Sequence, residues 1–185
     1  MKIAVNTRWL LQNKLEGIGN FSHNLLSRLV KNQPEVEFDF YFDRPFHASF
    51  LYGRNVNGIR LMPPARHPYL WYIWYEYSLK RKLNQTKPDL FFSPDGFIPT
   101  TGKTKTLNTI HDLNFEHNPD WVPSNVAKYY KKFFPLCTKV ATRLITVSEF
   151  SKKDVENTYG IADDKIDVVY NSASSTFIKK SDDEI

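Results

Sequence analysis

Residues 106–113 have the sequence TLNTIHDL, in which a short apolar strand is followed at once by a histidine and a carboxylate. The strand pattern covers Thr106–Ile110, and His111 and Asp112 come directly after it. Polar residues at the carboxyl end of a strand in an open α/β sheet face the crevice in which such folds bind ligands. His111 and Asp112 are therefore the first candidate site residues.

The sequence on both sides of this stretch alternates strands with helices. Helical spacing of apolar residues predicts helices over 19–31, 69–83, 124–141 and 149–159. Short apolar or alternating runs predict strands over 2–6, 37–42, 59–62, 89–93, 106–110, 144–147 and 165–170. Ser124 is expected to cap the third helix and Pro135 to kink it. The alternation predicts an α/β fold, a Rossmann-like, open, mostly parallel sheet with helices on both faces.

A chain of 185 residues, 41% of them hydrophobic, has the size and composition of one domain with a real core. The single cysteine, Cys137, excludes an internal disulfide and fits a reducing cytoplasm. We expect no signal peptide, because a strand follows Met1, and no apolar run reaches the roughly 18 residues of a membrane span. Residues 1–170 are expected to form the domain, and the polar residues 171–185 a linker or the start of a further domain.

The net charge of +5 is unevenly placed. One stretch carries six basic residues against the single acid Glu76: Arg60, Arg66, Lys80, Arg81, Lys82 and Lys87. Trp71 and Trp74 lie in the same stretch. This combination suits a membrane surface, a polyanion or a phosphorylated ligand. A core helix with a solvated basic end explains it equally well.

Gly17-Ile18-Gly19 opens the helix that follows the first strand. A helix N-terminus presents free N–H groups and a partial positive charge, and glycine allows a ligand to approach the backbone closely. The motif lacks the third glycine of a dinucleotide fingerprint, so a plain glycine-rich turn is the alternative.

Arg8, Ser148 and the pair His111 and Asp112 have both functional and structural interpretations. Arg8 follows the first strand, where it would meet a ligand or simply lie on the surface. Ser148 would bind ligand or cap the helix over 149–159, with Ser151 in its first turn. His111 and Asp112 would be a general base pair, a ligand contact or a histidine bonded to backbone. No metal is expected, because no further His/Asp grouping supports one.

Five motifs in this order resemble family 4 glycosyltransferases. They are Asn6-Thr7-Arg8 with Gly17–Phe21, KPDLFFSP at 87–94, HDL at 111–113, ITVSEFSK at 145–152 and IDVVYN at 166–171. The resemblance implies one half of a GT-B architecture, in which two Rossmann-like domains face each other across a cleft. This chain resembles the N-terminal, acceptor-side domain. In the family a second domain holds the nucleotide-sugar with a Glu-x7-Glu element, which this sequence does not contain.

The resemblance also implies site roles. Gly17, Ile18 and Gly19 would set backbone N–H groups against the donor diphosphate. His111 would lie beside the transferred sugar, with Asp112 orienting it. Arg8, Trp9 and Ser148 would face the acceptor. Retaining members of the family need neither metal nor cofactor, which leaves His111 a positioning and electrostatic role.

The expected function is therefore that of a retaining, metal-independent hexosyltransferase of mannose or glucose type, in polysaccharide biosynthesis. It would use a GDP- or UDP-hexose and a glycan or lipid-linked acceptor. The full-length protein would be the enzyme, and this piece alone would be inactive. A cytoplasmic location is expected, with a peripheral contact at the inner membrane face allowed.

A stand-alone, non-enzymatic Rossmann-like module is the alternative. It would recognise a sugar phosphate or assemble with a partner, and it would bind a small anion by itself. Nucleic acid is not expected as a partner, because no recognition motif accompanies the basic charge.

Overall fold

The computed structural model describes residues 1–172, and within them the strands form one seven-stranded parallel sheet in the order β3-β2-β1-β4-β5-β6-β7. The strands are β1 (Lys2–Asn6), β2 (Glu37–Phe42), β3 (Val56–Arg60), β4 (Leu90–Ser93), β5 (Thr106–Ile110), β6 (Arg143–Thr146) and β7 (Ile166–Val168). The strand order reverses direction between β1 and β4, which lie side by side. Ligands of open α/β sheets bind at such a switch point, beyond the carboxyl ends of the strands.

The helices connect these strands and are mostly short. They are α1 (Gly17–Asn32), α2 (Pro68–Ile73), the π-helical turn η2 (Trp74–Leu79), α3 (Lys80–Thr86), α4 (Asn114–His117), α5 (Ser124–Val140) and α6 (Glu149–Tyr159). Single 3₁₀ turns are η1 (Ala48–Phe50), η3 (Pro119–Trp121) and η4 (Asp163–Lys165). The chain runs from α2 through η2 into α3 without a break, so residues 68–86 form one helical rod with a π-turn inside it.

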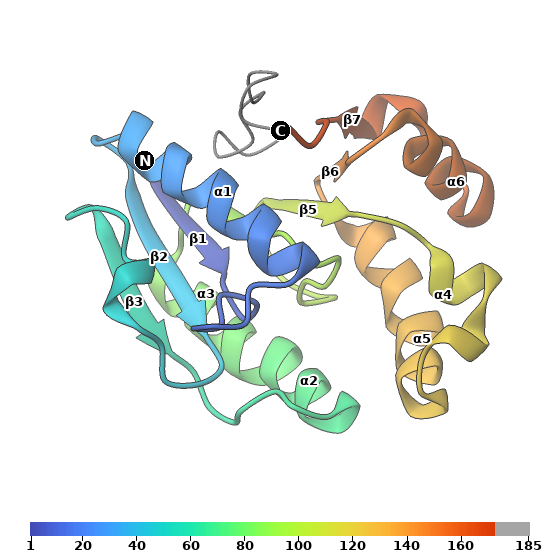
Figure 1. Cartoon of the computed structure of the whole chain (residues 1–185), viewed down its shortest axis with the longest axis horizontal. Helices are drawn as coiled ribbons and strands as arrows, with labels where there is room; N and C mark the ends of the chain where they lie inside the picture. Colours follow the sequence, from blue (N-terminus) through green and yellow to red (C-terminus); the bar gives the residue numbers. More distant parts are fainter. Residues whose placement is uncertain (173–185) are drawn as a thin grey trace, which may run out of the picture.

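The sheet separates two apolar clusters. Leu26 and Val30 of α1 pack with Phe38 and Phe40 of β2 on one face. The other face is covered by side chains of η2, α5 and α6, among them Trp74. Figure 1 shows α1 crossing one side of the sheet in front of β1 and β2. Helices thus cover both faces, and the predicted Rossmann-like α/β fold is confirmed.

The alternation within β2 shows how the sequence builds this arrangement. Successive side chains of a strand point to opposite faces. Phe38, Phe40 and Phe42 accordingly join the α1 cluster, whereas Tyr41 joins the cluster on the opposite face. Asp39 lies on that face too; it is 2% exposed and forms an ion pair with Lys2 Nζ at 2.9 Å.

Several predicted boundaries and one predicted helix cap were wrong; the helix expected over 69–83, for example, covers 68–86. The strand expected over 59–62 is Val56–Arg60, because pairing with β2 through Phe38↔Val56 and Phe42↔Arg60 sets its register. Ser124 does not cap α5 but is its first helical residue. Pro123 precedes the helix, and the Pro123 carbonyl accepts hydrogen bonds from the backbone N of Val126 and of Ala127. The last strand ends at Val168, earlier than expected. Of the expected linker, residues 173–185 lie outside the described residues.

Candidate functional site

The loops that follow four neighbouring strands are tied together at the carboxyl edge of the sheet. Asn6, at the end of β1, donates from Nδ2 to Ser93 Oγ (3.0 Å) and to Asp95 Oδ1 (2.9 Å) after β4. His111, after β5, bonds through Nε2 to the Pro94 carbonyl at 2.8 Å. Ser151, after β6, donates from Oγ to the His111 carbonyl at 2.9 Å. Polar groups from residues far apart in sequence therefore form one site at the switch point.

The bond to Pro94 shows which ring nitrogen of His111 carries a proton. A carbonyl oxygen only accepts, so Nε2 is the donor in this bond, and Nδ1 is the nitrogen that can face a ligand. The ring stands edge-on to Phe21 of α1, with centroids 4.8 Å apart and an interplanar angle of 89°. The interpretation of His111 as a histidine bonded to the backbone is thus confirmed. A contact of its other ring nitrogen with a ligand stays a prediction. The edge-on contact with Phe21 also places His111 next to the first turns of α1.

Asp112 is exposed. Its carboxylate accepts a hydrogen bond at 2.9 Å from the backbone N of Asn114, the first residue of α4. Among residues 1–172 the recorded bonds of the His111 ring do not include Asp112. The group that orients the ring is therefore the Pro94 carbonyl. A direct role for Asp112 toward a ligand remains a prediction.

The N-terminus of α1 has the properties expected of an anion site. Glu16 precedes the helix without a side-chain capping bond, and the first turn holds no acidic residue. The first N–H groups, on Gly17, Ile18 and Gly19, lack partners inside the helix by its geometry. They therefore carry the partial positive charge of the helix end.

The two glycines of this turn differ in what surrounds them. A Cβ on Gly19 would lie 2.7 Å from the Trp9 carbonyl oxygen, and that oxygen belongs to the backbone. A Cβ on Gly17 would meet nothing within 4 Å. Gly19 is thus required for the packing of α1 against the loop after β1, while Gly17 leaves open space beside the helix end.

We expect Gly19→Ala to lower the free energy of unfolding by about 1–3 kcal/mol, because the loop backbone must move to admit the methyl group. The matched Gly17→Ala variant should stay within about 0.5 kcal/mol of the unsubstituted chain. Urea denaturation of both variants measures the difference. Equal stability of the two variants would contradict the close contact at Gly19.

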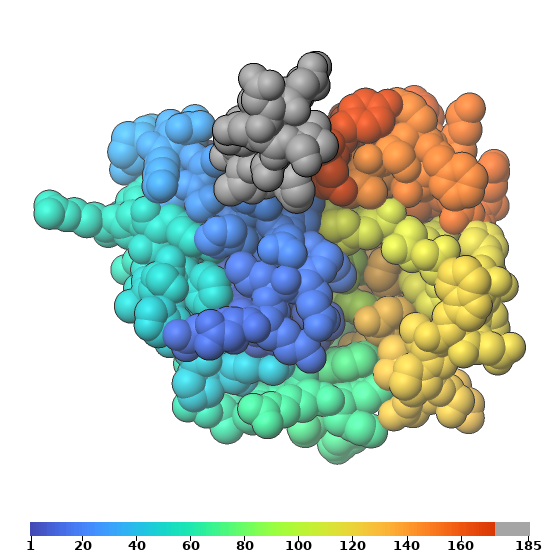
Figure 2. Space-filling view, viewed as in Figure 1, coloured from blue at the N-terminus to red at the C-terminus, as the bar shows by residue number. Residues whose placement is uncertain are grey.

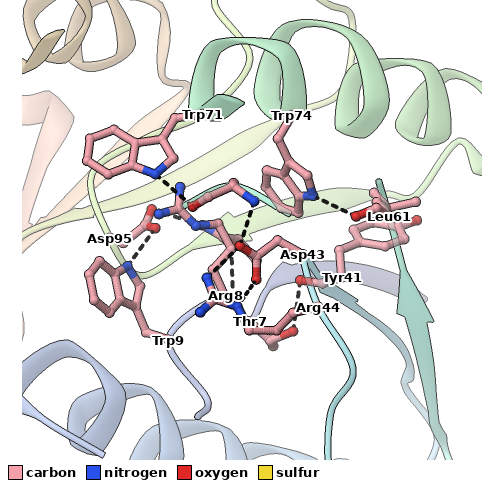
Figure 3. Close-up of polar contacts among 12 residues, drawn as sticks. Thr7, Arg8, Trp9, Tyr41, Asp43, Arg44, Leu61, Trp71, Trp74 and Asp95 are labelled. Atoms are coloured by element: carbon pink, nitrogen blue, oxygen red, sulfur yellow. Dashed lines mark hydrogen bonds and ion pairs between the residues drawn. The ribbon is translucent and has the colours of Figure 1, made fainter. Parts of the chain in front are cut away.

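Arg8 is not a surface residue, as one interpretation of the sequence held. It is 7% exposed, and Nη1 donates to Tyr75 Oη at 3.2 Å. Its guanidinium carbon lies 5.4–6.0 Å from the ring centroids of Tyr75 and three tryptophans: Trp9, Trp71 and Trp74. Burial opposes the charged form, but the neighbouring carboxylates of Asp95 and Asp43 favour it, and the pKa of Arg8 is raised. Arg8 therefore stays a cation inside an aromatic cage (Figure 3).

Asp95 is the centre of this network, and the sequence analysis did not single it out. It is 7% exposed and accepts from Asn6 Nδ2, Trp9 Nε1 (3.0 Å), Tyr75 Oη (2.9 Å), Ser93 Oγ (3.0 Å) and the backbone N of Phe97. The signal that could have found it is the one used for His111, since Pro94 and Asp95 also follow a strand directly. Tyr75 had no such signal, because it lies in the π-turn.

Burial raises the pKa of Tyr75 well above its ordinary value, so its hydroxyl keeps its proton and donates to Asp95. Trp71 and Trp74 lie in the basic stretch, and both indole N–H groups donate to backbone carbonyls of the protein. Trp74 is fully buried with Nε1 on the Leu61 carbonyl, and Trp71 Nε1 donates to the Ala65 carbonyl at 2.7 Å. Residues 68–86 are thus a core helix, and Arg81 lies on its exposed side.

Ser148 caps α6, as the structural interpretation predicted. Its Oγ accepts from the backbone N of Ser151 at 3.1 Å and also bonds Ser151 Oγ at 3.0 Å. The contact of Ser148 with an acceptor remains a prediction. Within residues 1–172 no group of three or more His, Cys, Asp or Glu side chains is placed to hold a metal ion.

Figure 2 shows the surface hollowed between the α1 half of the molecule, in blue, and the half formed by α4 and α5, in yellow and orange. Across the part of the chain that the structure describes, no helix combines the length and the apolar character needed to span a bilayer.

The sequence model of a family described as Glycosyltransferase Family 4 matches residues 15–174. The O-antigen chain mannosyltransferase RfbU of Salmonella typhimurium is 30% identical over 147 residues, which cover 78% of this chain and 40% of that protein. The O-antigen chain mannosyltransferase B of Escherichia coli is 24% identical over 191 residues, covering 98% of this chain and 50% of that protein. The chain thus spans about half the length of the curated relatives it matches.

Among solved structures, the apo form of the lipopolysaccharide outer core galactosyltransferase WaaB is similar, with a TM-score of 0.61. The match covers 94% of this chain and 46% of that chain. At 16% sequence identity it shows a shared fold.

Proposed function

This chain belongs to glycosyltransferase family 4, and we propose from this that it forms the acceptor-side domain of a hexosyltransferase. The reaction would move a hexose from a nucleotide-sugar to a glycan or lipid-linked acceptor, with retention of configuration and without a metal ion. Mannose is the favoured sugar, because both relatives described above are named mannosyltransferases.

One observation carries the proposal: at the carboxyl edge of the sheet, His111 contacts α1 about one turn from the uncapped N-terminus of that helix. The 4.8 Å contact between His111 and Phe21 joins them, and the Pro94 carbonyl holds the ring. A positively polarised helix end beside a fixed imidazole suits a ligand that carries both a diphosphate and sugar hydroxyls. A nucleotide-sugar is such a ligand.

Each group then has a role that its chemistry supports. Backbone N–H groups of Gly17, Ile18 and Gly19 would stabilise the negative charge that builds on the diphosphate as it leaves. His111 would accept a hydrogen bond from a sugar hydroxyl at Nδ1, which holds the sugar in a reactive orientation. Arg8 and Trp9, on the loop after β1, would lie toward the acceptor.

The donor, a GDP- or UDP-hexose, would be held mainly by a second domain across the cleft, as the GT-B architecture implies. Residues 1–185 by themselves would then bind the nucleotide weakly and turn over no substrate. A peripheral contact of the exposed basic side chains with an anionic membrane remains a prediction, and Trp71 and Trp74 would take no part in it because they face inward.

The proposal is tested with the full-length gene product, radiolabelled GDP-mannose, UDP-glucose and UDP-galactose, and lipid-linked glycan extracted from the source cells. We expect one donor to label the acceptor with its anomeric configuration retained, and the rate to be unchanged by excess EDTA. Loss of activity in EDTA that a divalent ion restores would contradict the metal-independent part. No transfer from any nucleotide-sugar, combined with tight binding of a sugar phosphate by residues 1–185, would favour the stand-alone binding module.

A further inference from the structure

A small pocket lined by arginine and tryptophan side chains lies at the carboxyl ends of β1 and β2. No acidic side chain lines it. Its lining includes three arginines and two tryptophans, which are Arg8, Arg44, Arg66, Trp9 and Trp71. Its volume is about 200 Å³. That is below the roughly 300–1,000 Å³ of sites for drug-sized ligands, so it suits a group of about one sugar ring.

The positive charge of this pocket exceeds the negative charge around it. Asp43 is fully buried, and its carboxylate accepts two hydrogen bonds from Arg44, one from Nε at 2.6 Å and one from Nη2 at 2.7 Å. Asp95 is near Arg8 and raises its pKa. Arg66 is exposed and has no ion pair among those recorded for residues 1–172. Three guanidinium groups against two carboxylates leave one positive charge without compensation.

The pocket is held in place before any ligand arrives. Asp43 Oδ2 also accepts from the backbone N of Ala65 at 2.9 Å, which ties the loop that carries Arg66 to the end of β2. Trp71 Nε1 bonds the carbonyl of the same Ala65. A site fixed by buried bonds loses little conformational entropy when it binds.

Arg8 has hydrogen-bonding capacity that its neighbours do not use. Its Nε is buried and has no hydrogen-bond partner in the described part of the chain. Buried donors without partners are rare in folded proteins, so the protein leaves this guanidinium group only partly satisfied. An oxyanion in the pocket would compensate the guanidinium charge of Arg8 and would accept from its accessible N–H groups.

The tryptophans add an apolar surface next to these charges. Both indole N–H groups already donate to the protein, Trp9 to Asp95 and Trp71 to Ala65. Both rings are half-buried, so what they offer the pocket is ring surface rather than a donor. Aromatic rings beside guanidinium groups suit a ligand with an apolar face and a charged end. Figure 3 shows Trp9 and Trp71 on either side of this region.

We propose that this pocket binds a charged sugar of the acceptor, with its oxyanion at Arg8, Arg44 and Arg66 and its ring against Trp9 and Trp71. The oxyanion would be the phosphate of a sugar phosphate or the carboxylate of a uronic acid. The assignment to the acceptor rests on the proposed function, whereas the binding itself does not.

Isothermal titration of the 185-residue chain with four probes tests the pocket: glucose 6-phosphate, glucuronate, glucose and inorganic phosphate. We expect at least one charged sugar to bind at least tenfold more tightly than glucose and inorganic phosphate, and its identity distinguishes phosphate from carboxylate. Affinity should fall as salt is raised. The proposal would be overturned if neither charged sugar binds, or if glucose or inorganic phosphate binds as tightly as the tighter of the two charged sugars.

Arg66→Ala is the informative variant, because Arg66 is exposed and supports no buried group. We expect it to weaken binding of the charged sugar about tenfold, as loss of a charge-assisted hydrogen bond does. The control Arg81→Ala removes an exposed arginine of α3, outside the pocket, and should leave the affinity unchanged. If both variants bind the charged sugar as tightly as the unsubstituted chain does, the proposed binding at this pocket is wrong.

The two proposals fail separately. If the full-length protein transfers no hexose while the chain binds the charged sugar in an Arg66-dependent way, the proposed function falls and the pocket stands. If transfer is seen and Arg66→Ala changes neither the titration nor the KM for acceptor, the pocket falls and the function stands.

Discussion

Asp95→Ala is expected to lower the free energy of unfolding by about 3–5 kcal/mol, because it breaks a buried charged network by removing one partner. Asp95 is 7% exposed and accepts from five different residues around the carboxyl ends of β1 and β4. Alanine would leave the Trp9, Tyr75 and Asn6 donors without this acceptor. It would also leave Arg8 without one of the carboxylates that favour its charged form.

Urea denaturation measures this loss as a lower midpoint with an unchanged slope. Asp95→Asn should cost less than Asp95→Ala, because the amide oxygen still accepts hydrogen bonds although it carries no charge. Asp120→Ala is the matched control, since Asp120 is exposed in η3 and a substitution there should change stability by about 0.5 kcal/mol or less. A loss below about 1 kcal/mol for Asp95→Ala would show that the network is not a structural centre.

His111→Ala in the full-length protein is expected to lower kcat at least about tenfold, with a smaller change in KM for the acceptor. The substitution removes the ring that the Pro94 carbonyl and Phe21 hold beside α1. Steady-state rates with the donor identified by the transfer assay measure the effect. The matched control is His117→Ala, because His117 is an exposed histidine whose ring bonds Asp154 of α6 at 2.8 Å.

A second substitution separates chemistry from folding. Glutamine at position 111 can still donate to the Pro94 carbonyl but has no imidazole Nδ1. We therefore expect His111→Gln to recover the stability that alanine loses while its kcat stays low. Full recovery of kcat by glutamine would reduce His111 to a structural residue, and a kcat for His111→Ala within twofold of the unsubstituted enzyme would remove it from the site.

Local periodicity explains why much of the fold was predictable. The strands over 2–6, 37–42 and 106–110 and the helix over 149–159 have the bounds expected from the sequence. Alternation and helical spacing are properties of a few consecutive residues, so they can be recognised without knowledge of the rest of the chain. The strand expected over 59–62 was misplaced because β2, and not the local sequence, sets the register of β3.

The sequence by itself determined the Rossmann-like architecture, and it singled out two parts of the candidate site, His111 and the glycines of α1. Both follow from rules that are local in the chain: a polar residue after a strand, and a glycine at a helix start. Only the tertiary structure decided that Arg8 is a buried cation and that Asp95 bonds Asn6, which lies 89 residues earlier. The same holds for the meeting of Arg8, Arg44 and Arg66 in one pocket. The physical reason is that parallel strands bring their carboxyl ends to one edge in an order that the crossovers fix, and no short stretch of sequence encodes that order.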